Sequence, residues 1–151
     1  MGLERDIAVI GRVALFRDLN RDQLRLLAFG AEHQELAAGT ELFAENAPAD
    51  SAYVVVRGEI ELFRQRGEDR ITIGKVGQGE LLGELALIVP GQRSTAAAAI
   101  VDSELLRLDQ KLFRRLLVEY PETALALHAA IATNLKKLLD RITALGAAFQ
   151  D

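Results

Sequence analysis

Apolar residues recur every three or four positions near the N-terminus, which is the spacing of one face of an α-helix. The residues that carry this spacing are Leu3, Ile7, Ile10, Val13 and Ala14. It predicts a first helix over residues 3–16. A second helix is expected over residues 21–30, where Asn20 can cap the N-terminus and Gly30 can end the helix.

From about Glu32 the pattern changes to short runs separated by glycine, asparagine, proline and aspartate at intervals of roughly ten residues, which is typical of a β-sandwich or barrel. The expected strands are residues 35–37, 41–44, 52–57, 59–64, 70–76, 96–101 and 105–108. Alternation of polar and apolar residues within the run 59–64 indicates a sheet with one face in water. We expect about eight antiparallel strands, enough to close a two-sheet roll over residues 32–109.

Helical spacing returns after the roll. Asp109 can cap a helix whose apolar face carries Leu112, Phe113, Leu116 and Leu117. Pro121 suits the first turn of a last helix that runs to about Phe149. At 1.5 Å per residue that helix spans roughly 43 Å, far more than the ~15 Å radius of gyration of such a domain. Part of it must project, fold back or pack against a partner.

Two apolar rows run along this last helix. The first is close to a heptad seam and consists of Ala124, Leu127, Ile131, Leu135, Leu138, Ile142 and Leu145. The second consists of Leu125, Ala132 and Leu139. If one row packs against the domain and the other against a second copy of the chain, both rows are buried. A homodimer through the C-terminal helix is therefore one expectation.

Composition narrows the class of protein. The chain has 151 residues, half of them hydrophobic, and we expect one domain over residues 1–151. The net charge of −4 and the interleaved acids and bases argue against a nucleic-acid surface. There is no cysteine for disulfides or thiolate metal sites, and no apolar run near the ~20 residues of a membrane helix. We expect a cytoplasmic protein that binds neither nucleic acid nor membrane.

The segment Gly83–Thr95 carries the clearest candidate chemistry. Backbone N–H groups at the start of a short helical turn point toward an anion, and Gly83 allows a close approach. Arg93 offers a planar fork for two phosphate oxygens, with Ser94 or Thr95 as hydroxyl donors. Ionised Glu84 only accepts hydrogen bonds, so it suits a sugar hydroxyl. The pattern predicts a site for a small, singly charged phosphate ester.

Together these features resemble the cyclic nucleotide-binding domain family, which includes the catabolite activator protein, the regulatory subunits of cyclic-AMP-dependent kinase and the nucleotide-gated channels. Besides the cassette 83–95, the resemblance rests on the segments Ala38–Thr40, Tyr53–Gly58, Val76–Glu80, Leu105–Phe113 and Tyr120–Glu122. It implies an α+β fold in which two N-terminal helices (residues 1–31) and two closing helices (residues 110–150) flank the eight-stranded roll. Asn46 stands where the family usually has glycine, and asparagine tolerates the left-handed conformation.

The resemblance also implies roles for individual residues. Glu84 would bind the ribose 2′-hydroxyl and Arg93 the cyclic phosphate. The remaining candidates of the phosphate cradle are Gly83, the backbone N–H groups of Leu85 and Ala86, Ser94 and Thr95. Leu138 and Leu139 align with the lid positions that face the base.

Function follows from this resemblance as an expectation. The chain would be a regulatory sensor without catalytic residues, cofactor or metal. Its ligand would be cyclic AMP or cyclic GMP, and Ser94 resembles the residue of the cyclic-AMP binders. Ligand would shift the population toward a state in which the last two helices close on the cassette, and an effector protein would receive the signal.

Two other functions remain open. One is a domain of the same fold that has lost its ligand and serves only interaction or dimerisation. The other is a cupin-type metal enzyme, because a jelly roll also supports that chemistry. A metal site needs clustered histidine and carboxylate ligands, whereas the two histidines, His33 and His128, are distant in sequence.

Overall fold

The computed structural model describes the backbone of residues 2–149 and the side chains of residues 2–134, 136 and 137. Its N-terminal part consists of α1 (Leu3–Gly11), a 3₁₀ turn η1 (Ala14–Phe16) and α2 (Arg21–Gly30). The single helix expected over residues 3–16 is therefore wrong beyond Gly11. The chain becomes extended at Val13, which lets both Val13 and Phe16 turn into the core.

The second helix begins and ends as expected. The Asn20 side chain accepts a hydrogen bond from the Gln23 N–H at 2.9 Å, and the Gln23 side chain accepts one from the Asn20 N–H at 2.9 Å. This reciprocal capping box satisfies two backbone donors that the helix itself leaves free. Gly30 ends the helix against the later helix α3 (Gln110–Glu119), where an added Cβ would lie 2.4 Å from the Leu112 side chain.

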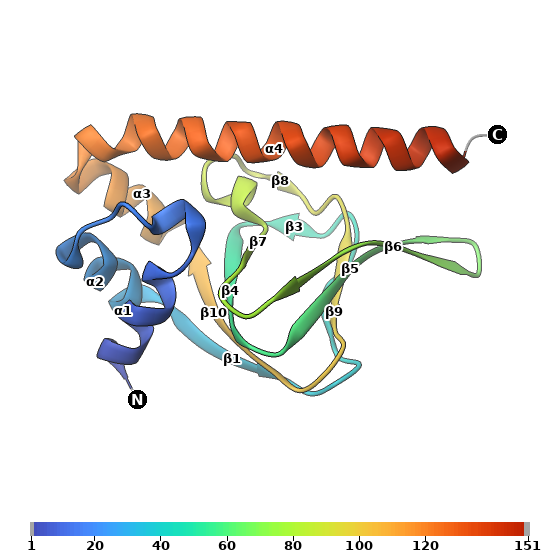
Figure 1. Ribbon diagram of the computed structural model, residues 1–151, viewed down its shortest axis with the longest axis horizontal. Helices are drawn as coiled ribbons and strands as arrows, with labels where there is room; N and C mark the ends of the chain where they lie inside the picture. The colour runs from blue at the N-terminus through green and yellow to red at the C-terminus, as the bar shows by residue number, and fades with distance from the viewer. Residues whose placement is uncertain (1, 150–151) are drawn as a thin grey trace.

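The middle of the chain forms an antiparallel roll, as expected from the sequence (Figure 1). In the described residues it has ten strands: β1 (Glu32–Leu36), β2 (Glu41–Phe43), β3 (Pro48–Ala49), β4 (Ser51–Arg57), β5 (Glu59–Arg66), β6 (Asp69–Gly77), β7 (Leu81–Leu82), β8 (Gly91–Gln92), β9 (Ala96–Ala99) and β10 (Ser103–Asp109). One sheet has the order β1-β10-β4-β7 and the other the order β2-β9-β5-β6. A short pair, β3 and β8, stands apart from both.

Strand β4 connects the two apolar cores of the molecule. Tyr53 and Val55 point into the roll, where they join a cluster that includes Ile60 and Leu105. Val54 and Val56 point to the opposite face and pack against the helices. Because successive side chains of a strand alternate between its faces, a strand that is buried on both faces reads as a continuous apolar run.

The two closing helices are α3 (Gln110–Glu119) and α4 (Pro121–Phe149). Asp109 caps α3 as expected, because its carboxylate accepts a hydrogen bond from the Leu112 N–H at 2.7 Å. Figure 1 shows α4 lying across the roll and the helical cassette turn. It contacts α3, η1 and that turn, and its Leu127 and Ile131 are buried in the helical core.

Candidate functional site

The cassette begins with a left-handed turn at Gly83, whose φ is 76°. A 3₁₀ turn, η2 (Glu84–Leu87), follows at once. The Ala86 N–H donates to the Gly83 carbonyl at 3.0 Å and closes this turn, while the Leu85 N–H has no acceptor among the described residues. One backbone donor of the expected cradle is therefore free in this conformation, and the other is held by the turn.

Arg93 is the most unusual side chain of the cassette, because it is a charged residue with only 6% exposure. Its Nη2 donates to the Ser51 carbonyl at 2.8 Å and lies 3.4 Å from the Ser51 hydroxyl. Its guanidinium lies 4.2 Å from the ring centroid of Phe43 and 5.8 Å from that of Tyr53. These contacts hold the guanidinium in place through its apolar faces and one of its nitrogens.

The backbone of Arg93 is fixed as well. Its N–H donates to the Ala47 carbonyl at 2.8 Å, and its own carbonyl accepts from the Asn46 N–H at 2.8 Å. Asn46 has a φ of 69° and is the one non-glycine residue with positive φ among residues 2–149. Asparagine at this point thus takes the left-handed conformation expected from the sequence. The result is a rigid loop that presents the arginine.

The charge of Arg93 is not neutralised within the part of the chain that the structure describes. No carboxylate there forms an ion pair with it, and its buried Nε has no hydrogen-bond acceptor. Burial lowers the pKa of this guanidinium from its ordinary value, although Tyr53 and Asp50 offset part of the shift. A buried cation without a counter-ion is unfavourable unless an anion accompanies it.

Glu84 is tied to the covering helix. Its carboxylate accepts a hydrogen bond from the Asn134 side-chain amide of α4 at 3.0 Å. Burial raises the pKa of the Glu84 carboxyl, and the hydrogen bond from Asn134 partly opposes that rise. The cassette and α4 are therefore joined directly in this conformation, through a residue that could also accept a ligand hydroxyl.

The other expected site residues fall into three groups. The side chain of Ser94 is exposed beside Arg93, whereas Thr95 is buried immediately before strand β9. Leu85 is half-buried and packs against the helical core, and Ala86 is buried. Leu138 and Leu139 belong to α4, but their side chains lie outside the described residues.

The sequence reasoning missed four residues of the site: Ser51, Phe43 and Tyr53 around Arg93, and Asn134 above Glu84. None of them belongs to the cassette segment itself. Ser51 and Tyr53 lie at the start of strand β4, and Ser51 contacts Arg93 from 42 residues away in the chain. Asn134 is a polar residue between the apolar positions Ile131 and Leu135 of the last helix, which is a weak signal for a contact with the cassette.

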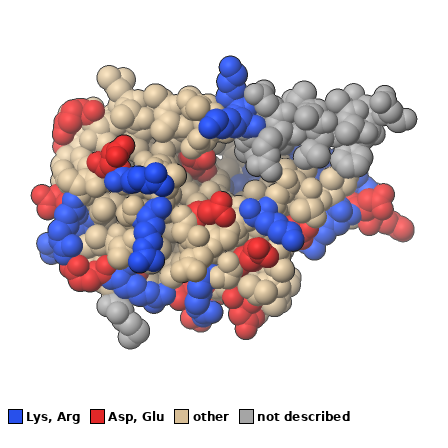
Figure 2. Space-filling model, in the orientation of Figure 1, with Lys and Arg blue, Asp and Glu red and all other residues tan. Residues whose placement is uncertain are grey.

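The distribution of charged side chains and of possible metal ligands bears on the kind of site. In Figure 2, Lys and Arg side chains and Asp and Glu side chains are interspersed over the face that is drawn. No group of three or more histidine, cysteine, aspartate or glutamate side chains is placed there to hold a metal ion, so the cupin-type alternative has no donor set in that part of the chain. None of the described helices combines the length and apolar character needed to cross a membrane.

The fold alone defines a class, namely β-roll domains covered by helices at both ends of the chain. The sequence matches the cyclic nucleotide-binding domain family over residues 33–120. This chain therefore belongs to the cyclic nucleotide-binding domain family, a family of regulatory ligand-binding domains. The expected fold, an α+β roll flanked by helices, is confirmed.

Curated relatives are longer than this chain. The cyclic AMP receptor protein of Thermus thermophilus is 31% identical over 125 residues, which cover 82% of this chain and 57% of that protein. Lysophospholipase NTE1 of Pyricularia oryzae is 30% identical over 113 residues, which cover 74% of this chain and 8% of that enzyme. The chain thus spans a small part of the lysophospholipase and little more than half of the receptor.

Two solved structures match this chain over nearly their whole length. A cyclic nucleotide-binding-like protein from Brucella abortus is 50% identical, with a TM-score of 0.68, and the match covers 74% of this chain and 97% of that one. The N-terminal domain of a transcriptional regulator from Streptomyces coelicolor is 35% identical, with a TM-score of 0.76 and coverage of 87% and 95%. Half of the matched residues differ between the Brucella protein and this chain, although the two share the fold.

Proposed function

We propose that this chain is a cyclic nucleotide sensor that binds cyclic AMP in preference to cyclic GMP and catalyses no reaction. The observation that carries the proposal is Arg93, a buried cation held by a backbone carbonyl and two aromatic rings, without a carboxylate partner among the described side chains. A cyclic phosphodiester brings the single negative charge that this position lacks. The Thermus relative, described as a cyclic AMP receptor protein, supports the choice of base.

Each candidate residue has a role in this proposal. Arg93 and the free Leu85 N–H bind the phosphate, Ser94 adds a hydroxyl, and Gly83 leaves room for the guanidinium. Glu84 accepts the ribose hydroxyl. Ala86 and Thr95 support the cradle from behind, since both are buried and the Ala86 N–H is used within the turn. Leu138 and Leu139 would cover the base as apolar surfaces.

A calorimetric titration of the full chain with cyclic AMP and with cyclic GMP tests the ligand. We expect saturable binding of both, with the smaller dissociation constant for cyclic AMP. If neither nucleotide binds, the proposal is wrong. Tighter binding of cyclic GMP would keep the sensor function and contradict only the choice of base.

The same hydrogen bond that joins Glu84 to Asn134 supports a mechanism. A ribose hydroxyl would compete with the Asn134 amide for the Glu84 carboxylate, and α4 would then settle in a second position on the occupied cassette. Ligand can shift α4 only by binding one position more tightly than the other. The Asn134–Glu84 contact at 3.0 Å would supply such a difference, because a ribose hydroxyl on the same carboxylate would replace it.

Substitution Asn134→Ala should release α4 before ligand arrives. We expect faster amide hydrogen exchange in α4 of the ligand-free variant than in wild type, and a smaller further change when cyclic AMP is added. Thr133→Ala is the matched control, since the Thr133 hydroxyl bonds only to the Ala129 carbonyl of its own helix. Equal exchange in the Asn134→Ala variant and wild type would contradict the coupling.

An interaction domain is the second candidate, and one observation favours it. Leu125 on α4 is 82% exposed, and Ala132, seven residues later on the same face, is exposed as well. These residues belong to the second apolar row, whereas Leu127 and Ile131 of the first row pack inside the domain. A homodimer would cover the second row. A stable dimer in sedimentation, with no nucleotide binding in calorimetry, would favour this candidate.

An effector protein that receives the signal and a cytoplasmic location both stay predictions.

A further inference from the structure

A groove of about 350 Å³ lies between α1 and the β-roll, and the proposed nucleotide site does not use it. The groove is lined by Arg5, Ala8, Val9, Arg12, Val56, Arg57 and Gln78. Arg5 lies on α1 and Arg12 is the residue that directly follows its last turn, and both line the groove on its helical side. Arg57 ends strand β4 on the opposite side. Three guanidinium groups and an amide therefore line this groove, and no carboxylate does.

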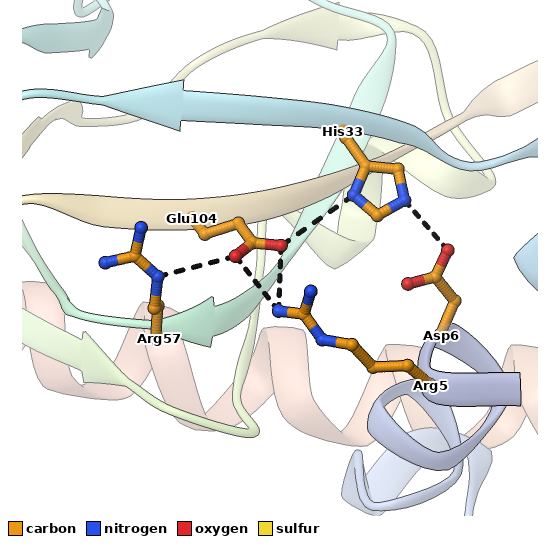
Figure 3. Close-up of polar contacts among 5 residues, drawn as sticks. All are labelled: Arg5, Asp6, His33, Arg57 and Glu104. Carbon is orange, nitrogen blue, oxygen red and sulfur yellow. Dashed lines mark hydrogen bonds and ion pairs between the residues drawn. The ribbon is translucent and has the colours of Figure 1, made fainter. Parts of the chain in front are cut away.

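One carboxylate lies beside the groove. Glu104 of β10 accepts from Arg5 Nη2 at 2.9 Å with both of its oxygens, and Arg57 Nε approaches Oε1 at 3.4 Å (Figure 3). The hydrogen bond from Arg5 and its charge lower the pKa of the Glu104 carboxyl, with smaller help from Arg57. Glu104 is thus ionised and already satisfied, and it fixes two of the three arginines in position.

These arginines keep unused donors. Each guanidinium carries five N–H groups, and Glu104 takes only one nitrogen from Arg5 and one from Arg57. Figure 3 shows the terminal nitrogens of Arg57 turned away from Glu104. The Arg12 side chain has neither a hydrogen bond nor an ion pair with the described residues. The guanidinium donors of Arg12 are therefore available to a ligand in the groove.

The carboxylates near the groove lie beside it and not in its lining. Besides Glu104 they include Asp6, which meets His33 at 2.8 Å, and Glu35, the partner of Glu104 across the β1–β10 pair; His33 Nδ1 also lies 3.8 Å from Glu104 (Figure 3). The three arginines and these three carboxylates are equal in number, and the guanidinium groups are the ones that line the groove. A phosphate monoester carries about −1.5 to −2 at neutral pH, and planar guanidinium forks match its oxygens.

We propose that the groove between α1 and the roll is a second anion site, which binds a phosphate group held by Arg5, Arg12 and Arg57, with Gln78 as a further donor. Such a ligand would join α1 to the end of β4 and to the turn before β7. It would stabilise the docked position of α1 without touching the cassette. The phosphate could belong to a free small molecule or to a lipid headgroup, and both present the same chemistry to the arginines.

Backbone amide NMR of the full chain during titration with inorganic phosphate locates the binding. We expect shifts in α1 and around Gln78 that saturate together, and an increase of the melting temperature with phosphate concentration. Shifts confined to residues 83–95 would mean that phosphate binds at Arg93 only, and they would overturn the second site. This readout keeps the two sites separate, so failure of the proposed cyclic nucleotide function would leave it unaffected.

Substitution Arg12→Gln provides the decisive comparison, because Arg12 is exposed and makes no contact on which the fold depends. Loss of one charge-assisted hydrogen bond should weaken phosphate binding in α1 about tenfold or more. Arg12→Lys should recover part of the affinity, since lysine keeps the charge but not the fork. Arg114→Gln, which removes an exposed arginine of α3, is the charge-matched control and should leave binding unchanged.

Vesicles of phosphatidylcholine, with and without phosphatidic acid, distinguish the two sources of the phosphate. Saturable binding of inorganic phosphate that Arg12→Gln weakens assigns a soluble ligand. Binding only to vesicles with phosphatidic acid, weakened by the same substitution, assigns a lipid headgroup. Absence of binding to both probes, or equal binding by wild type and Arg12→Gln, would overturn the proposal.

Discussion

Arg93→Met is expected to weaken cyclic AMP binding by at least about a hundredfold while leaving the fold intact. The guanidinium would contribute two charge-assisted hydrogen bonds to the cyclic phosphate, each worth about 1.5–3 kcal/mol. Methionine keeps an unbranched apolar side chain over Phe43, whose ring lies 4.2 Å from the guanidinium. Calorimetry with cyclic AMP measures the loss.

The stability of this variant should move in the opposite direction. The wild-type protein buries a guanidinium whose Nε has no acceptor among the described residues. Replacing a buried charge by an apolar side chain of similar size is often neutral or stabilising. We therefore expect an unchanged or higher free energy of unfolding without ligand, measured by urea denaturation.

Arg70→Met is the control for both measurements. Arg70 also lies over an aromatic ring, 3.6 Å from the centroid of Phe63, but it pairs with Glu61 and its side chain is 49% exposed. Its loss should leave nucleotide affinity unchanged. If Arg93→Met binds cyclic AMP as wild type does, Arg93 is not the phosphate ligand.

Local signals were sufficient for most of the fold. Helix α2 and the last helix begin and end where capping residues, proline and periodicity place them, because these signals act within a few residues of the helix ends. The expected strands also form, and the roll closes as expected. Strands β3, β7 and β8 were missed, since two residues carry no alternation that could reveal them.

Errors arose where tertiary packing overrides local pattern. Residues 3–16 keep helical spacing throughout, yet the helix ends at Gly11 because Val13 and Phe16 both bury their side chains in the core. Strand β1 begins at Glu32, earlier than its apolar residues indicate, because it pairs with β10 along its whole length. The residues of a strand do not by themselves indicate that it pairs with a strand far away in the sequence.

Some residues of the candidate site are indicated by local sequence signals, and others join it only through tertiary packing. Gly83, Glu84 and Arg93 lie in one short segment whose residue types indicate an anion-binding site, so these three residues could be predicted from the sequence. Asn134 is fifty residues from Glu84 in the chain, and their contact depends on how α4 crosses the cassette. Such contacts follow from packing that periodicity alone does not specify.

The buried position of Arg93 relates the stability of the protein to ligand binding. The protein keeps a cation in a largely buried position, and Ser51 and the two aromatic rings hold it where an anion would arrive. That arrangement is unfavourable by itself and favourable with ligand, so it increases the stabilisation that binding confers. Sites that are preorganised for a ligand commonly reduce the stability of the empty protein in this way.

Gly83→Ala is expected to weaken nucleotide binding at a moderate loss of stability. Gly83 has a φ of 76°, which an alanine adopts at a cost of about 1–2 kcal/mol. An added Cβ would lie 2.6 Å from Arg93 Nη1 and 3.4 Å from the Ser51 carbonyl oxygen. The second contact is ordinary, whereas the first requires the flexible end of Arg93 to move. The guanidinium would then leave the phosphate position, and we expect a loss of affinity of at least about tenfold.

Gly39→Ala separates this effect from backbone strain. Gly39 has a φ of 85°, close to that of Gly83, but an added Cβ there meets no atom within 4 Å. Both variants should therefore lose similar stability in urea denaturation, while only Gly83→Ala loses cyclic AMP binding in calorimetry. If both variants bind cyclic AMP as wild type does, the position of the Arg93 guanidinium does not govern binding. If both lose affinity to the same extent, the defect comes from strain in the fold, because Gly39 lies in the turn between β1 and β2, away from the cassette.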